Sequence, residues 1–148
     1  MEQEIKKHTL DLLKTLSFDA KVEVSKDGEV YLIKIITEDN PSLLIGRHGQ
    51  MLRSLSRVLS VILFQQLGQK IELNLDINDY REGQKKHLEE VAEKHILRLQ
   101  ESGSPVTLRH FSSYERKIIH EYITSSHPEL ASHSEGEGEE RILIIENK

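Results

Sequence analysis

The chain has 148 residues, of which 36% are hydrophobic and 30% are charged, and its formal net charge is −5. This composition is typical of a globular chain with one ordinary domain or two small ones, and no uncharged apolar stretch of about 18 residues supports membrane insertion. The charged letters MEQEIKKHTL do not resemble a secretory signal, and the absence of cysteine excludes disulfides and thiolate zinc sites, so a cytoplasmic location is expected.

The negative net charge argues against a nucleic-acid partner, but the distribution of charge along the chain reverses that impression. No acidic residue lies between Asp39 and Glu72, and much of the negative excess falls in the late stretch SEGEGEE. The basic residues of the acid-free stretch are Arg47, Arg53, Arg57 and Lys70. Because phosphate binding depends on local lysine and arginine, a basic surface is expected here.

The first elements are a helix followed by a β-hairpin. Residues 2–16 carry apolar side chains at helical spacing, which predicts an amphipathic helix. Residues 18–24 alternate apolar and polar side chains, the letters KDG supply turn chemistry, and residues 29–37 read as a more buried strand.

Two helices and a strand complete the first unit. Asn40 is expected to cap a very short helix that begins at Pro41 and ends at Gly46. A longer helix then runs from Gly49 to about Gln66. The apolar face predicted for it comprises Met51, Leu52, Leu55, Val58, Leu59, Ile62 and Leu63. The alternating letters KIELNLDI predict a closing strand, so the order of elements is αββααβ.

The second unit is predicted to begin with a long helix. Asn78 or Asp79 can cap this helix, which runs to about Glu101 and is stopped by the letters SGSP. Its predicted inner face includes Leu88, Val91, His95, Ile96 and Leu99. A histidine on such a face is more often a satisfied core residue than a metal ligand.

A strand, a helix and a final strand follow. The letters VTLR form a short strand candidate, and RILII forms the last one. Between them, Phe111 precedes Ser112 and Glu115, which have the spacing of a capping box, so a helix is expected from there to about Ser125. The SEGEGEE stretch is interpreted as a solvated acidic turn, because its carboxylates lack the spacing of a calcium loop.

The letters GRHG separate two helices of the first unit and place Arg47 and His48 between Gly46 and Gly49. Glycine lets the backbone approach a phosphate chain closely, and the start of the following helix offers N–H groups to an anion. Arg53 and Arg57 lie one turn apart and would extend this basic surface. The alternative is an ordinary corner between helices with solvated arginines.

In this position, LLIGRHGQMLRSLSRVL resembles a K-homology (KH) domain of type II topology. The resemblance implies that Gly46, Arg47, His48 and Gly49 clamp a single-stranded backbone of about four nucleotides. It also implies an adjoining apolar groove for the bases, which Ile45 and Leu52 would border or support.

The letters SSYERKIIHEY place Arg116 and His120 four residues apart on one helix face, with Ser113 and Lys117 beside them. In isolation such a pair is usually a solvated face. However, YERKIIH followed by SEGEGEERILII resembles the small domain family named for its Arg-x-x-x-His signature. That resemblance implies contacts to single-stranded nucleic acid by Arg116 and His120, with Lys117 beside them.

A type II KH unit followed by an Arg-x-x-x-His domain resembles the Jag family of bacterial RNA-binding proteins, and the letters DYRE between the units also fit. The resemblance covers roughly residues 18–146. It implies an α/β (α+β) chain with a KH domain at 1–78 and an Arg-x-x-x-His domain at 79–148. Many Jag proteins carry a further N-terminal domain, and roles that depend on it are not expected of this sequence.

The expected function is therefore single-stranded RNA binding in post-transcriptional regulation, with no catalytic residues, no metal and no cofactor; single-stranded DNA is an alternative ligand. The rival hypothesis is an assembly protein that pairs with a small single-KH protein or with itself in cell elongation or division. A metal-dependent enzyme is a third hypothesis, but the eight histidines include no H-E-x-x-H pattern.

Overall fold

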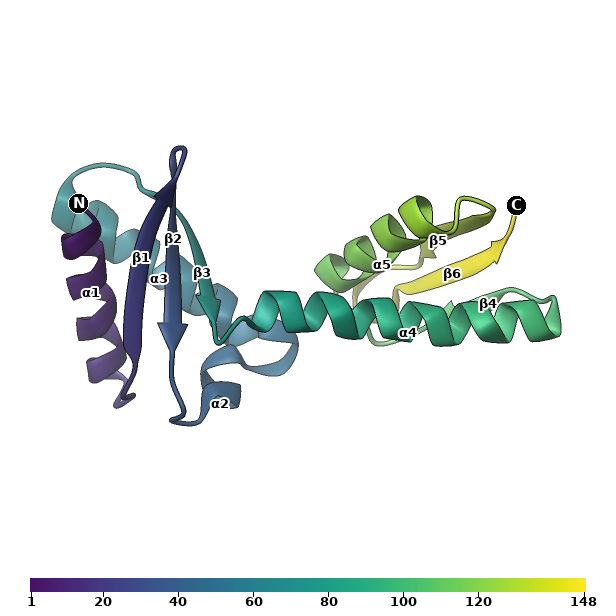
Figure 1. Cartoon of the computed structure of the whole chain (residues 1–148), viewed down its shortest axis with the longest axis horizontal. Helices are drawn as coiled ribbons and strands as arrows, with labels where there is room; N and C mark the ends of the chain where they lie inside the picture. Colours follow the sequence, from purple (N-terminus) through teal and green to yellow (C-terminus); the bar gives the residue numbers. More distant parts are fainter. The chain divides into compact units, whose positions relative to one another are not determined.

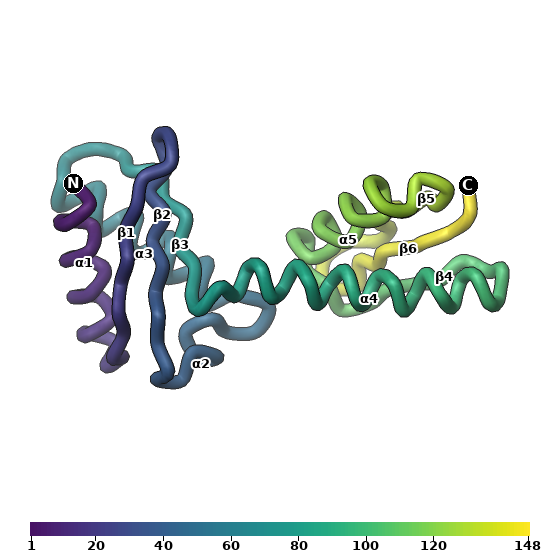
Figure 2. Tube along the Cα trace, viewed as in Figure 1, coloured from purple at the N-terminus to yellow at the C-terminus, as the bar shows by residue number.

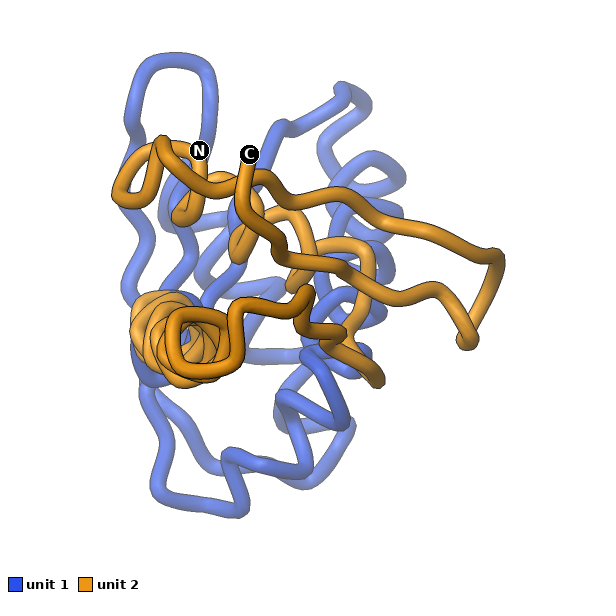
Figure 3. Tube along the Cα trace, turned by 90° about the vertical axis from the view of Figure 1, so that its right-hand side faces the viewer, with its two compact units in different colours: residues 1–81 blue, residues 82–148 orange.

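A computed structural model describes residues 1–148, and the chain divides into two compact units, residues 1–81 and 82–148 (Figure 3). Each unit has its own three-stranded sheet and its own buried apolar cluster. No helix is both long enough and apolar enough to cross a membrane.

Unit 1 has the predicted αββααβ order (Figure 1). Its elements are α1 (Glu2–Thr15), β1 (Lys21–Asp27), β2 (Val30–Ile36), α2 (Pro41–Ile45), the 3₁₀ turn η1 (Arg47–Gly49), α3 (Gln50–Leu67) and β3 (Glu72–Ile77). The strands lie in the order β1-β2-β3, with β1 antiparallel and β3 parallel to the central β2. The type II KH arrangement predicted from the sequence is thus confirmed at the level of fold.

The core of unit 1 lies between its sheet and the helices α1 and α3. Alternate residues of each strand face these helices, while Val30, Leu32 and Ile36 on the opposite face of β2 are more than a third exposed. The largest fully buried side chains of this core are Ile5, Leu13, Ile33, Ile35, Leu44, Leu59, Leu63, Leu75 and Ile77. Burial of this apolar surface supplies the main driving force for folding of the unit.

Two details of the predicted helices in unit 1 are wrong. Val58, predicted on the inner face of α3, is 48% exposed, because the buried row of Leu52, Leu55, Leu59 and Leu63 runs along the other side of the helix. Asn40 precedes α2 in a left-handed conformation and makes no capping hydrogen bond. Its amide donates instead to Asp39 Oδ1 at 3.3 Å, so Pro41 alone marks the start of the helix.

The junction after β3 also differs from the prediction that Asn78 or Asp79 caps the next helix. The Asn78 amide continues the sheet, since its Oδ1 accepts from the Thr37 N–H at 3.0 Å and its Nδ2 donates to the Thr37 carbonyl at 2.8 Å. Asp79 pairs with Lys34 at 2.8 Å. The Arg81 N–H in the first helical turn donates to Asp76 Oδ1 at 3.3 Å instead.

Unit 2 is a small antiparallel sheet packed against two helices (Figure 1). The elements that form it are α4 (Tyr80–Ser102), whose first turn contains the division between the units, β4 (Val106–Leu108), α5 (Ser113–Ser126), β5 (Leu130–Glu135), the turn η2 (Gly138–Glu140) and β6 (Ile142–Asn147). The strand order is β4-β6-β5. Strand β5 was not predicted, because its letters LASHSE carry little apolar alternation.

The start of α5 confirms the predicted capping box. Ser112 Oγ accepts from the Glu115 N–H at 3.2 Å, and Glu115 Oε2 accepts from the Ser112 N–H at 2.7 Å. His95 on α4 is half-buried, with Nδ1 2.9 Å from the Val91 carbonyl, so its environment is that of a satisfied core residue.

Candidate nucleic-acid interface

The loop from Gly46 to Gly49 turns the chain between α2 and α3 (Figure 2). Gly46 has φ 73° and ψ 177°, and both His48 and Gly49 lie in the left-handed region with φ 54° and 71°. The Gly46 N–H donates to the Ser42 carbonyl at 2.9 Å and so ends α2, and the Gly49 N–H donates to the Gly46 carbonyl at 3.3 Å. Three positive φ values within four residues give a corner that ordinary residues rarely adopt.

Gly46 has no room for a side chain, and Gly49 has little. A Cβ atom at Gly46 would lie 2.8 Å from both the Cβ and the backbone nitrogen of Met51, a separation that real Cβ atoms essentially never show. A Cβ at Gly49 would lie 3.3 Å from Cε1 of Tyr80, whose ring packs beside the loop. The glycines are therefore favoured by the turn itself, in which Gly46 is half-buried, Gly49 is buried and Arg47 is exposed.

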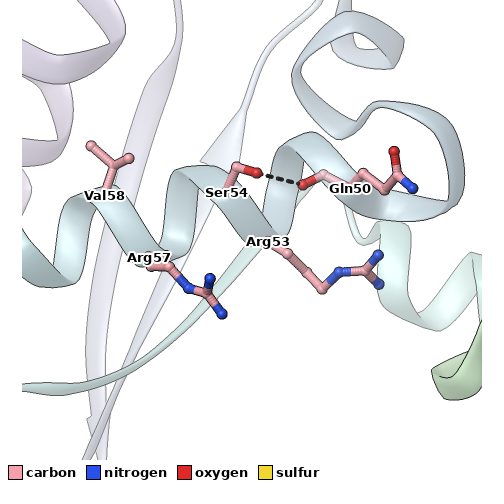
Figure 4. Close-up of a pocket in the computed structure, with 5 residues that line it drawn as sticks. All are labelled: Gln50, Arg53, Ser54, Arg57 and Val58. Atoms are coloured by element: carbon pink, nitrogen blue, oxygen red, sulfur yellow. Dashed lines mark hydrogen bonds between the residues drawn. The ribbon is translucent and has the colours of Figure 1, made fainter.

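The cations expected beside the loop are in place. Arg47 is exposed and forms no hydrogen bond or ion pair, while Arg53 Nη1 donates to the His48 carbonyl at 3.5 Å, the long limit of a hydrogen bond. On α3, an open groove of about 580 Å³ is lined by Gln50, Arg53, Ser54, Arg57 and Val58 (Figure 4). The two arginine side chains extend to the same side of the helix in this view.

Three other residues named in the sequence analysis, Ile45, Leu52 and Lys70, lie in the core or form an ion pair within unit 1. Leu52 is buried in the core and Ile45 is half-buried, so Leu52 supports the loop from below rather than bordering a groove. Lys70 pairs with Glu72 at 2.8 Å, and this hydrogen bond raises the pKa of the lysine. Its charge is compensated within the unit, unlike that of Arg47 or Arg57.

In unit 2, Arg116 does not lie on the exposed face that its spacing suggested. Its side chain is only 8% exposed, with Nη1 donating to the Phe111 carbonyl at 2.6 Å and Nη2 donating to Ser113 Oγ at 3.2 Å. These bonds tie the segment before α5 to the first turns of the helix. Two of the five N–H donors of the guanidinium therefore hold the start of α5.

His120 and Lys117 are the exposed members of the signature region. His120 Nδ1 lies 2.6 Å from Ser132 Oγ on β5, and Lys117 Nζ approaches Glu121 at 3.8 Å. Ser132 was missed by sequence reasoning because β5 was not predicted. Tyr80 was also missed as a neighbour of the loop, although the letters DYRE had drawn attention to its segment.

No group of three or more histidine, aspartate or glutamate side chains is arranged to hold a metal ion. The acidic residues of the SEGEGEE stretch are exposed, and Glu135 lies 3.0 Å from His133.

Comparison with protein families gives a match in the C-terminal part of the chain. The domain family named for its Arg-x-x-x-His signature matches residues 86–147. The chain is 32% identical over 131 residues to "RNA-binding protein KhpB" of Bacillus subtilis, covering 88% of this chain and 62% of that protein. It is 28% identical over 138 residues to the KhpB protein of Lactiplantibacillus plantarum, covering 93% of this chain and 42% of the relative.

A similar match is found to "RNA-binding protein KhpB" of Streptococcus pneumoniae, at 28% identity over 131 residues, covering 88% of this chain and 40% of the relative. The chain thus spans less than two thirds of the length of each of these curated relatives. The similarity runs through both units and includes the Arg-x-x-x-His domain. Over this shared region, the chain belongs to the KhpB (Jag) family.

Proposed function

We propose that the chain binds single-stranded RNA through the Gly46–Gly49 loop and acts in post-transcriptional regulation in the cytoplasm, without catalysing a reaction. Sequence similarity to proteins described as RNA-binding supports RNA as the ligand. The observation that carries the proposal is the geometry of the loop. Two glycines turn the backbone tightly beside arginines that form no ion pair, in a stretch without acidic residues.

The loop can bind a phosphate chain in two ways. Bare backbone at a glycine corner allows a phosphate to approach closely, and the first turn of the 18-residue helix α3 offers N–H groups and the positive end of a helix dipole. Arg47, Arg53 and Arg57 supply net positive charge to the same surface. Phosphate contacts of this kind position a strand without reading its sequence.

Unit 2 adds a second contact in this proposal. The exposed His120 and Lys117 face solvent and can meet a phosphate or a base edge, while Arg116 keeps the start of α5 in place for them. Two modest sites on one chain gain from effective concentration when a single RNA strand is long enough to reach both.

The proposal is tested by fluorescence anisotropy with a labelled pool of single-stranded RNA, and with the DNA equivalent in parallel. The variant Gly46→Asp/Gly49→Asp places two carboxylates and two side chains in the loop. We expect it to lose at least about tenfold in affinity, because the phosphate site is both filled and made negative. A matched control is Gly28→Asp/Gly103→Asp, which makes the same charge change at two positive-φ glycines with open space around them.

Equal binding by the loop variant and the control variant would overturn the role of the loop. The absence of RNA binding by the wild-type chain would overturn the proposed function as a whole. Circular dichroism of each variant checks that both sheets and the helices are retained.

A second candidate function, assembly with another KH protein, is favoured by one observation. Val30, Leu32 and Ile36 are exposed on the outer face of the central strand β2, where a partner could cover them. Analytical ultracentrifugation of the wild-type chain and of Leu32→Lys separates the two candidates. Association that Leu32→Lys abolishes, without RNA binding by the wild type, would favour assembly.

A further inference from the structure

The exposed side of α3 carries a row of residues that continues away from the loop. Gln50, Arg53, Arg57, Val61 and Phe64 follow one another at intervals of three or four, so they lie in line on a helix, and all five are exposed. The row therefore begins at the loop with polar and basic side chains and ends with apolar ones.

Phe64 is an unusual residue to find on such a surface. It is 56% exposed, the highest value among the seven aromatic residues of the chain, and its neighbour in the row, Val61, is 54% exposed. Phe64 belongs neither to the buried core of unit 1 nor to the apolar residues packed against that core. Clustered exposed apolar side chains commonly mark a surface that another molecule covers.

The charge around the row indicates what kind of molecule would cover it. Two arginines precede Phe64 in the row, and no acidic residue occurs between Asp39 and Glu72 to compensate them. A single-stranded nucleic acid combines an anionic backbone with flat apolar bases, which matches a row of cations followed by an aromatic ring. A protein partner would need matching carboxylates and an apolar patch in the same order.

The length of the row also fits a strand that extends beyond the loop. At a rise of about 1.5 Å per residue, Phe64 lies roughly 22 Å along the helix from Gly49 and roughly 10 Å from Arg57. A KH loop holds only about four nucleotides. A longer RNA that leaves the loop along α3 would meet Arg53, Arg57 and then the ring.

We propose that the row from Arg53 to Phe64 is an extension of the RNA site, in which Phe64 stacks on a base of the strand after the loop has bound its phosphates. This inference rests on the proposed RNA-binding function and assigns a base-stacking residue to it. Stacking tolerates any base, so the extension lengthens the bound segment without setting its sequence.

The first experiment compares affinities of the full chain for oligouridines of increasing length. We expect Phe64→Ala to leave binding of a four-nucleotide RNA unchanged and to weaken binding of a twelve-nucleotide RNA by about tenfold, the scale of one lost stacking contact. Phe64→Tyr should restore the affinity, whereas Phe64→Leu, which is apolar but has no ring, should not. Leu97→Ala, at an apolar residue of α4 that is 55% exposed, is the matched control.

The second experiment uses the absence of tryptophan from the chain. Phe64→Trp introduces a single fluorophore into the row, and stacking by a base should quench its emission on addition of twelve-nucleotide RNA. Leu97→Trp gives the same fluorophore at a comparably exposed position outside the row, and its emission should stay unchanged.

The outcomes distinguish this inference from the function on which it rests. If wild type binds RNA and the loop variant does not, but Phe64→Ala equals wild type at every length, the stacking site is wrong while the loop site stands. If Phe64→Ala changes sedimentation of the protein and leaves RNA affinity unchanged, the row is a surface for a second copy of the chain, which also overturns the inference. If the wild type binds no RNA, both proposals fail.

Discussion

At the scale of single residues, Gly46 and Gly68 flank the segment formed by the loop and α3. Both have a positive φ, 73° and 71°, but a Cβ at Gly46 would clash with Met51 whereas nothing lies within 4 Å at Gly68. Their ψ angles also differ, 177° at Gly46 and 10° at Gly68, so Gly46 combines the close approach to Met51 with a backbone region that is essentially restricted to glycine.

We predict that Gly68→Ala lowers the free energy of unfolding of unit 1 by about 1–2 kcal/mol, the cost of a left-handed alanine. Gly46→Ala should cost about 1–3 kcal/mol more, because Met51 and the helix backbone must shift. Hydrogen exchange of the α3 amides measures both values in the intact chain. Equal losses at the two positions would show that neither the close approach to Met51 nor the ψ angle of Gly46 adds to the requirement for glycine.

A second residue-scale prediction concerns Arg116. Removing its two hydrogen bonds in Arg116→Ala should destabilise unit 2 by about 2–3 kcal/mol, since each involves a charged donor and leaves the Phe111 carbonyl unpaired. Arg116→Lys should recover only part of this, because lysine cannot reproduce the fork. His120→Ala, at an exposed side chain, should change stability by less than about 1 kcal/mol. Urea unfolding followed at unit 2 amides checks the order of the three variants.

The residues of the loop were predictable from sequence, whereas the environment of Arg116 was not. The loop is marked by two glycines around two cations, a local pattern whose geometry depends on neighbours in the chain. The Arg116 side chain is held by hydrogen bonds to the Phe111 carbonyl and to Ser113 Oγ. The spacing of residues along a helix does not reveal such bonds. The exposed position expected for Arg116 from its spacing was therefore wrong.

At the scale of elements, a polar network joins the C-terminal end of α5 to α4 within unit 2. His127 Nε2 and the Tyr122 hydroxyl both meet Glu93 Oε1, at 2.6 and 2.5 Å, and His127 Nδ1 lies 3.3 Å from Glu129. The hydrogen bond to Glu93 raises the pKa of His127 and raises that of Tyr122 to about 12, while the bonds from Tyr122 and His127 lower the pKa of Glu93. The helix dipole also stabilises the positive charge of a protonated His127, because this residue lies at the C-terminal end of α5.

This network predicts how the stability of unit 2 depends on pH. The folded pKa of His127 lies above the ordinary value of 6.5, so its contribution is fully present below that value and is lost as the pH rises through the raised pKa. We expect wild type to exceed His127→Gln in stability by about 1 kcal/mol at pH 5.5 and the difference to shrink toward pH 9. Glu93 stays ionised at pH 5.5, because its own pKa is lowered.

Urea unfolding of the two proteins at both pH values measures the difference, and Lys7→Gln on α1 serves as a control outside the network. A difference that grows with pH would contradict the assignment of His127 as the titrating group.

Helices were predicted more accurately than strands, for a physical reason. The ends of α3 and α5 are set by local signals, namely glycines and a capping box, and their inner faces by periodic apolar residues. Strand β5 is stabilised by pairing with β6, which lies later in the chain, and its own residues are mostly polar. Pairing between distant segments overrides the weak local signal.

At the scale of the whole molecule, both units should contribute to binding only when the RNA is long. We predict that Lys117→Ala/His120→Ala leaves the affinity for a four-nucleotide RNA unchanged and lowers that for a long strand by about tenfold or more, because the second contact then becomes intramolecular. Isothermal titration with oligouridines of several lengths measures this. Equal losses at all lengths would place the second contact and the loop on the same short segment.

The order of the two modules could be predicted from sequence because each carries a short motif and the pair occurs in a fixed order. The match to the Arg-x-x-x-His domain family confirms the second module, and the KhpB relatives confirm the family over the shared region. The network around His127 was not predictable, since Glu93 lies on α4, far along the chain from Tyr122 and His127 at the end of α5, and no motif links them.

The most direct test of RNA binding through phosphate contacts at the loop is the salt dependence of affinity, measured by anisotropy for a twelve-nucleotide RNA. Each phosphate contact to a single strand adds about 0.7 to the slope of log affinity against log salt. We predict that Arg53→Gln/Arg57→Gln reduces the slope by about 1.4, whereas Lys7→Gln/Lys14→Gln on α1 leaves it unchanged. A slope that is the same in wild type and in both variants would contradict the binding of RNA phosphates by Arg53 and Arg57.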